Sequence, residues 1–254
     1  MNIIVPIKLV PDLVEELILD EKGKAFDPDW LRLKLSEFDD HAVEQALILK
    51  DRGVGQVTVI APEADGVDDV LYTLAAKGAD RIIKLTGGTE QTENNHALAR
   101  WLAPIIKGLQ PGLILTGVQA HNDLDGPMGA LLAEYLGIPY VGYVARVQVN
   151  DGNTTIHKEY PGGLVAEMEV YLPAVLGIQV AEQPPRYVAF SKIRQIMKTV
   201  TIEERSVAEA DTSGGPVIQR MFQPESCQKA EMIPGDADEV AARLVDIFVE
   251  SGVL

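Results

Sequence analysis

The chain has 254 residues, and 46% of them are hydrophobic, which suits one large α/β domain with or without an extension. Its 38 acidic and 22 basic side chains give a net charge of −16, which disfavours nucleic acid and anionic membranes as partners. No stretch approaches the roughly 20 apolar residues of a membrane-spanning helix. The single cysteine, Cys227, and an N-terminus without a signal pattern predict a cytoplasmic location without direct membrane insertion.

Short β-branched runs alternate with helical patterns through the first half of the chain. The predicted strands cover residues 3–7, 56–60, 81–84 and 113–115, and the predicted helices cover residues 42–50, 67–76, 97–107 and 130–136. Alternation at this spacing indicates βαβ units. The sequence therefore predicts an α/β fold of the Rossmann-like, adenine-nucleotide-binding kind, with a parallel sheet and helices on both faces.

The pattern changes after residue 145. A turn at Asp151-Gly152-Asn153 between two strand-like runs predicts a β-hairpin addition, and residues 167–172 and 174–179 predict further strands. Adjacent prolines, Pro184 and Pro185, then interrupt regular structure, and polar sequence continues to a last amphipathic helix near residues 238–250.

We interpret these changes as three parts: a nucleotide-binding domain at 1–180, a partner-recognition loop at 181–200 and an extended C-terminal arm at 201–254. An arm with one late helix is expected to pack on another subunit. The alternative is a tail that folds back onto its own domain.

The segment from Leu113 to Gly129 carries the strongest functional signal. An apolar strand leads into a loop rich in Gly, Asn and Asp, and a helical pattern follows at once. This order places a helix N-terminus at the carboxyl edge of the sheet, where free N–H groups and the helix dipole favour a phosphate. Small residues would let a ligand approach the backbone closely; they are Gly117, Ala120, Gly126 and Gly129.

The start of the first long helix allows two interpretations. With Asp39 as N-cap, Phe38 and Val43 would form a hydrophobic staple, which needs no ligand. The same helix start also lies beyond the first strand, at the same sheet edge as the phosphate loop, so its amides could face a shared ligand. The pattern alone leaves both open.

Catalytic and metal-binding patterns are missing from the sequence. The four histidines lack metal-ligand spacing, and there is no nucleophile elbow, Walker loop or Gly-x-Gly-x-x-Gly motif. We therefore expect neither catalytic nor metal-binding residues, and a hydrolase is the weakest candidate.

Seven short motifs, in order and over essentially the full length, resemble the beta (small) subunit of electron transfer flavoproteins. They are Val5-Pro6-Ile7-Lys8, Phe38 to Ala46, Lys77 to Arg81, Gly117 to Ala120 with Asp123 and Gly129, Glu159 with Gly162-Gly163, Leu172 to Val175, and Pro185-Arg186-Tyr187. A further motif, Arg220-Met221-Phe222-x-Pro224, is similar to the branch that pairs with trimethylamine-dehydrogenase-type enzymes.

The resemblance implies an electron carrier subunit and not an enzyme. Such a subunit pairs with an alpha subunit that holds the redox FAD, and it buries one structural AMP itself. Phe38 would lie near the flavin ring, and Leu13 occupies a second such position. The implied AMP contacts are Pro6, Ser36, Glu37, Phe38, Asp39, Pro62, Gly117, Val118, Gln119, Ala120, His121, Asn122, Asp123, Leu124, Asp125, Gly126, Pro127 and Met128.

The resemblance also implies docking surfaces. Glu159 falls where the family has a carboxylate that pairs with the alpha flavin domain. Residues 184–198 match the loop that docks on donor dehydrogenases before electrons pass to a downstream oxidoreductase. Phe190 stands at its apolar anchor position, and the accompanying docking residues are Lys192, Ile193 and Lys198.

Two alternatives share the predicted fold. An electron-bifurcating flavoprotein would bind a second FAD in place of AMP, but the loop from His121 to Pro127 lacks the pattern of those relatives. A stand-alone adenine-nucleotide-binding regulator would share the sheet order, and the C-terminal arm argues against it.

Overall fold

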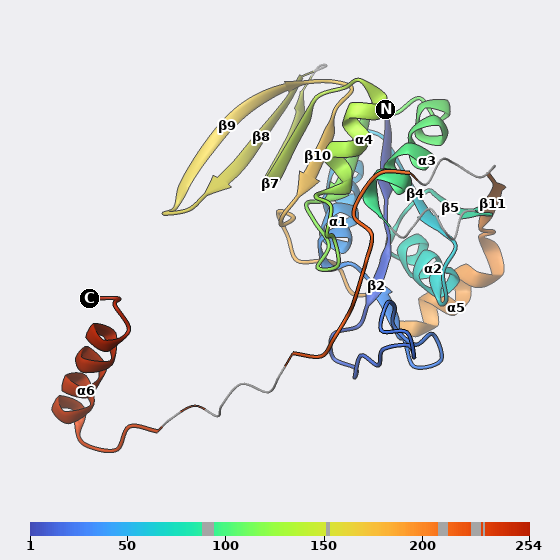
Figure 1. Ribbon diagram of the computed structural model, residues 1–254. Coiled ribbons are helices and arrows are strands. Elements are labelled where there is room, and N and C mark those ends of the chain that lie inside the picture. Colours follow the sequence, from blue (N-terminus) through green and yellow to red (C-terminus); the bar gives the residue numbers. More distant parts are fainter. Residues whose placement is uncertain (88–93, 151–152, 208–212, 225–229, 231) are drawn as a thin grey trace. The chain divides into compact units, whose positions relative to one another are not determined.

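The computed structural model describes residues 1–87, 94–150, 153–207, 213–224, 230 and 232–254. These residues form two compact units, Met1–Arg220 and Met221–Leu254, which we describe separately. A nine-stranded sheet organises the first unit, in the order β11-β5-β4-β1-β6-β10-β7-β8-β9 (Figure 1). The strands are β1 (Asn2–Pro6), β4 (Gln56–Pro62), β5 (Arg81–Thr86), β6 (Leu113–Gly117), β7 (Tyr140–Asn150), β8 (Asn153–Tyr160), β9 (Leu164–Tyr171), β10 (Val175–Ile178) and β11 (Glu203–Ser206).

Helices cover both faces of this sheet. On one face, α1 (Glu37–Asp51) and α2 (Val67–Lys77) pack on one apolar core. On the other face, α3 (Asn95–Gly108) and α4 (Met128–Leu136) pack on a second core. A small antiparallel pair, β2 (Leu9–Pro11) with β3 (Leu33–Leu35), lies between β1 and α1 in the chain.

The central strand β1 shows why the sheet needs two cores. Its side chains alternate between the faces: Ile3 and Val5 belong to the core beneath α1 and α2, and Ile4 belongs to the core beneath α3 and α4. All three are almost completely buried. A strand covered on both faces is apolar along its whole length, which is the pattern of buried parallel sheets.

The predicted α/β fold is confirmed. All strand pairs from β11 to β7 are parallel, and the pairs β7–β8 and β8–β9 are antiparallel. The predicted hairpin is thus the first half of a three-stranded addition, and β10 inserts between β6 and β7. Of its predicted turn at 151–153, residues 151 and 152 lie outside the described residues, and Asn153 begins β8.

The segment after residue 180 differs from the sequence interpretation. The predicted recognition loop contains a helix, α5 (Phe190–Thr199), and β11 then pairs with the edge strand β5. The first unit consequently continues to Arg220, past the boundary expected at 180. β11 was missed because its sequence, Glu-Glu-Arg-Ser, is polar: it lies at the sheet edge, where ion pairs such as Arg81–Glu203 hold it.

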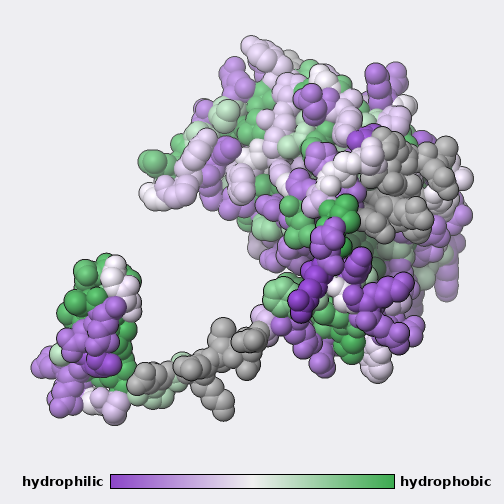
Figure 2. Space-filling view, viewed as in Figure 1, coloured by the Kyte–Doolittle hydropathy of each residue, from purple (hydrophilic) through white to green (hydrophobic). Residues whose placement is uncertain are grey.

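The second unit contains α6 (Ala237–Glu250). A capping box starts this helix, because Asp236 accepts from the Glu239 amide and the Glu239 side chain accepts from the Asp236 amide. Leu244, Val245 and Phe248 are exposed, and hydrophobic side chains are visible on the helix surface in Figure 2. Among the described residues, no helix has both the length and the apolar character to cross a membrane.

Candidate functional site

The strand order reverses between β1 and β6, and we refer to the sheet edge at this switch point as the β1–β6 crevice. The chain runs from β1 to β4 and β5 on one side, then returns to the other side of β1 as β6. The segments after β1 lead to α1 on one face of the sheet, and the loop after β6 leads to α4 on the other. Such a switch point, at the carboxyl ends of the strands, is where open α/β sheets bind ligands.

Asp39 joins the two sides of this crevice. Its Oδ2 accepts from the Lys8 amide, just beyond β1, and its Oδ1 accepts from the Gly117 amide at the end of β6, both at 2.9 Å. The side chain therefore connects the first turn of α1 to two neighbouring strands. Each of its two carboxylate oxygens thus accepts one backbone amide.

Of the two interpretations of this helix start, the one with Asp39 as N-cap is wrong. Helix α1 begins at Glu37 with Ser36 as N-cap, and the Ser36 side chain makes no capping bond. Asp39 lies inside the first turn, so Phe38 and Val43 do not hold the N′ and N4 positions of a hydrophobic staple. The long-range bonds to Lys8 and Gly117 determine the position of Asp39, and neither is visible in the local sequence.

Burial raises the pKa of Asp39 to about 6, because the carboxylate loses its hydration. The amide donors of Lys8 and Gly117 favour the charged form and offset part of this effect. The side chain of Lys8 also favours the charged form, whereas Asp123 opposes it. The charge of the Asp39 carboxylate thus depends on its burial and on its neighbours Lys8, Gly117 and Asp123.

Residues 118–127 form a loop that carboxylates hold in place. Asp123 pairs with Lys8 Nζ and accepts from the Ala120 amide at 2.8 Å. Lys8 Nζ also donates to Asn95 Oδ1 at 3.2 Å. The loop is consequently attached to the end of β1 and to the start of α3.

Asp125 occupies the N-terminus of α3. Its Oδ2 accepts from the amides of Asn95 and His96 at 2.7 and 3.2 Å, and Asn95 Nδ2 donates to Gly126 O at 2.8 Å. The N-terminus of α4 is different: among the described residues, no acceptor bonds the amides of Met128 and Gly129. The α4 amides are therefore available to a ligand, and so are the first amides of α1, which likewise have no acceptor among the described residues.

Two of the small residues, Gly117 and Gly129, have a packing role. A Cβ on Gly117 would lie 2.6 Å from Asp39 Oδ1 and 2.8 Å from Phe38 Cβ. A Cβ on Gly129 would lie 2.4 Å from Thr116 Oγ1. Their lack of a side chain lets α1 and α4 approach β6 closely.

The structure brings the other predicted cofactor residues to the same sheet edge. Pro6 and Pro62 end the neighbouring strands β1 and β4 and are buried. The side chains of the loop differ in their exposure to solvent. Val118, Ala120 and Met128 are buried, and the exposed residues are Gln119, His121, Asn122 and Leu124.

Sequence reasoning missed two residues that order this edge, Lys8 and Asn95. Lys8 stands in the quoted Val-Pro-Ile-Lys motif, so a signal for it existed. Asn95 carries no local signal, because its contacts to Lys8 and Gly126 come from distant parts of the chain.

The predicted docking residues lie on other elements. Glu159 is exposed on β8, where it borders a hollow of about 320 Å³ with Arg146, His157 and Glu182. Phe190 begins α5 and is 75% exposed. Lys192 and Lys198 are exposed on the same helix, and Ile193 is half-buried.

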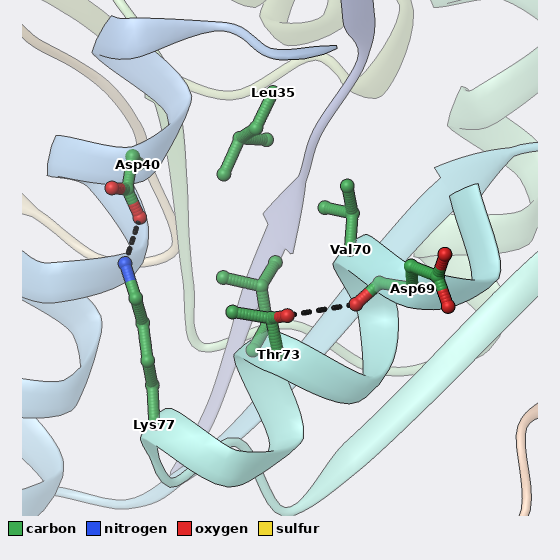
Figure 3. Close-up of a pocket in the computed structure, with 7 residues that line it drawn as sticks. Leu35, Asp40, Asp69, Val70, Thr73 and Lys77 are labelled. Atoms are coloured by element: carbon green, nitrogen blue, oxygen red, sulfur yellow. Dashed lines mark hydrogen bonds and ion pairs between the residues drawn. The ribbon is translucent and has the colours of Figure 1, made fainter. Parts of the chain in front are cut away.

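A second hollow, of about 240 Å³, lies between α1 and α2 (Figure 3). Leu35, Val70 and Leu74 supply apolar lining, and Lys77 forms an ion pair with Asp40 at 2.5 Å. Neither of these two hollows includes a residue of the 117–128 loop.

Comparison with known proteins identifies the family. A model described as "Electron transfer flavoprotein domain" matches residues 30–210. The chain is 32% identical to "Electron transfer flavoprotein subunit beta" of Methylophilus methylotrophus over 262 residues, covering 98% of each chain. It is 30% identical to the protein of that name from Clostridium acetobutylicum, again over 98% of each chain, and 34% identical to the one from Syntrophomonas wolfei over 78% of this chain and 77% of that one. The chain therefore belongs to the electron transfer flavoprotein family, as a beta subunit.

Proposed function

We propose that this chain pairs with an alpha subunit in a heterodimer that carries electrons from donor dehydrogenases to a downstream oxidoreductase. In this proposal the alpha subunit holds most of the FAD, and the present chain supplies a structural AMP and a docking surface. Family membership and similarity along the whole length support the proposal. The pairing with a trimethylamine-dehydrogenase-type donor stays a prediction.

The arrangement at the β1–β6 crevice carries the AMP part of the proposal. The α4 amides of Met128 and Gly129 have no acceptor among the described residues, and a phosphate fits such donors at a helix N-terminus. The carboxylates of Asp39, Asp123 and Asp125 are all bonded to protein donors, which reduces their repulsion of a bound phosphate. The exposed loop residues would contact the remaining parts of the nucleotide.

Counting the nucleotides of the purified heterodimer tests this proposal. Denaturation should release one FAD and one AMP per heterodimer, measured by chromatography against protein concentration. Two FAD and no AMP would establish a bifurcating flavoprotein. Release of AMP or ATP without flavin or a partner subunit would instead support a stand-alone regulator.

The docking part of the proposal concerns α5. Phe190 is a large exposed aromatic side chain, and the helix sequence Phe-Ser-Lys-Ile-Arg-Gln-Ile-Met-Lys-Thr contains three basic residues and no acidic one. An apolar anchor beside cations suits a partner surface with an apolar pocket and acidic surroundings. This helix is positively charged, whereas the whole chain has a net charge of −16.

Glu159 is proposed as the contact to the alpha flavin domain. Its exposure on β8 leaves the carboxylate accessible to a cation from a partner. Replacing Glu159 with Gln should change electron-transfer rates without changing the nucleotide count. Equal rates in both proteins would contradict this assignment.

A further inference from the structure

The segment that leads from β10 into α5 has no backbone ladder of its own. Residues 180–188 are all described, and none of them takes part in a backbone–backbone hydrogen bond. The segment includes Pro184 and Pro185, which have no amide hydrogen to donate. Side-chain contacts must therefore determine where this segment lies and where α5 begins.

Helix α1 supplies the first of these contacts. The Ala181 amide donates to His41 Nδ1 at 3.3 Å, and the Glu182 amide donates to Gln45 Oε1 at 3.0 Å. The Glu182 carboxylate then accepts from Gln45 Nε2 and from both terminal nitrogens of Arg52, at 2.8 to 3.0 Å. The segment thus follows one face of α1.

The contact nearest to α5 involves a buried carboxylate, Glu44. Its Oε2 accepts from the Arg186 amide at 2.9 Å, and its Oε1 accepts from Arg186 Nε at 2.9 Å and Nη2 at 2.9 Å. The Glu44 side chain is only 2% exposed. One carboxylate consequently holds both the backbone and the guanidinium of the same residue, which constrains position and orientation together.

A second carboxylate on α1 also contacts Arg186, but in a different environment. Asp51 Oδ2 lies 3.0 Å from Arg186 Nη2, and its side chain is 62% exposed. Water screens an exposed pair, so this contact contributes little. A buried carboxylate that loses its partner remains uncompensated, so the Glu44 contact is much harder to replace.

The far end of α5 is held independently. Ile196 and Val200 pack against the core beneath α1 and α2, and α5 contacts α2. Beyond it, β11 pairs with β5, where Lys84 lies 2.9 Å from Glu204. In Figure 1, α5 lies beside α2 and leads into β11 at the edge of the sheet. At the start of the helix, by contrast, the Phe190 side chain is 75% exposed.

We infer that Glu44 is the positioning residue for the docking end of α5: it holds Arg186 and thereby orients Phe190 toward the donor. This inference rests on the proposed docking function of α5. Glu44 touches neither a cofactor nor the donor in this account, and it acts through Arg186. Binding of the donor to α5 should therefore depend on Glu44, although Glu44 does not contact the donor.

Hydrogen exchange on the purified heterodimer tests the position of the helix directly. In Glu44→Gln, peptides covering residues 186–193 should exchange about tenfold faster, because the loss of charge-assisted bonds releases the segment. Residues 196–200 and β1 should exchange as in the wild type. Arg186→Lys keeps the charge but loses the planar donor pair, so it should give a change in the same direction. Asp51→Asn is the matched control and should exchange as the wild type does.

Electron-transfer kinetics distinguish positioning from loss of folded protein. With a trimethylamine-dehydrogenase-type enzyme reduced by trimethylamine as the probe, Glu44→Gln should raise the KM for the heterodimer about tenfold and leave kcat within about twofold. The FAD and AMP counts should not change. A merely structural defect would reduce the amount of active protein and affect kcat as well.

Defined results would overturn the inference. Wild-type exchange at 186–193 in both Glu44→Gln and Arg186→Lys would do so, as would an equal effect of Asp51→Asn. If Glu44→Gln does not fold, Arg186→Lys decides, because its side chain is partly exposed and retains its charge. If Phe190→Ala leaves the rate of electron transfer unchanged, the proposed docking function of α5 is wrong. Whether Glu44 positions the helix is then decided by the hydrogen-exchange results alone.

Discussion

The proposed nucleotide site at the β1–β6 crevice and the segment 180–188, which leads to the proposed docking helix α5, are held by different kinds of contact. At the crevice, strands, helix starts and a buried carboxylate are joined through backbone amides, as in the bonds of Asp39 to Lys8 and Gly117. Between β10 and α5, residues 180–188 depend on side chains of α1, chiefly Glu44 and Gln45.

This difference indicates what each region can change. Groups that bond to the backbone inside a packed core tolerate few substitutions. An added atom finds no room there, and a lost hydrogen-bond acceptor leaves a buried amide without a partner. Surface segments held by side chains can be altered without disturbing the sheet. We therefore expect crevice variants to affect stability and nucleotide content, and docking variants to affect electron transfer.

The largest expected effect is on packing at the crevice. In Gly117→Ala the new Cβ would lie 2.6 Å from Asp39 Oδ1, which forces α1 and β6 apart. We expect a loss of about 3 kcal/mol in the free energy of unfolding, with reduced AMP content. Urea unfolding and a nucleotide count measure both. Gly108→Ala, on α3 with no atom near its Cβ, is the control and should be neutral or slightly stabilising. Unchanged stability in Gly117→Ala would mean that the crevice is not tightly packed.

A pH-dependent effect of similar size should arise from Asp39. Its pKa of about 6 in the folded protein lies above its ordinary value of 3.8, so the native state holds this proton more tightly. The resulting stabilisation is fully present below pH 3.8 and is lost as the pH rises through about 6. The difference of about two pKa units corresponds to about 3 kcal/mol.

Asp39→Asn removes this titration. Unfolding curves of the heterodimer between pH 4 and 7 should show wild-type stability decreasing relative to the variant as the pH rises. At pH 7 the variant also lacks one acceptor for the two amides, which lowers its own stability by about 1–3 kcal/mol. Parallel stability profiles for the two proteins would contradict a raised pKa at this position.

The docking anchor should have the next largest effect, confined to kinetics. Phe190→Ala removes an exposed aromatic group, and we expect kcat/KM for reduction by the donor to fall about 30-fold, equivalent to about 2 kcal/mol. FAD content and thermal stability should be unchanged. Val217→Ala, an exposed apolar residue of the same unit, provides the comparison. A loss of FAD in Phe190→Ala would contradict the expectation that docking variants affect electron transfer and not nucleotide content.

The smallest effect is expected from the charged surroundings of that anchor. At low salt, Lys198→Gln should lower the rate of association with the donor about two- to threefold, because an exposed cation mainly accelerates the diffusional encounter of the two proteins. The difference should disappear at about 0.5 M salt. Lys107→Gln, an exposed position on α3, is the charge-matched control. An equal effect of both substitutions would show that net charge, rather than the location on α5, matters.

Much of the fold was predictable from the sequence. Apolar strands such as residues 113–115 stand out because they are buried on both faces, and helices such as 67–76 carry a clear amphipathic pattern. The elements that were missed are held by distant partners: β11 is polar and pairs at the sheet edge with β5. Its charged residues predict a solvated tail unless Arg81 and Lys84 are known to face them.

The candidate site shows the same division. The sequence by itself determined the position of the loop between β6 and α4, because a strand followed by a small, polar loop and a helix is a local pattern. Only the tertiary structure decided the roles of Asp39, Gly117 and Glu44, since their partners lie 31 to 142 residues away along the chain. Local propensity reports which element a residue joins, whereas a long-range hydrogen bond depends on which elements the folded sheet brings into contact.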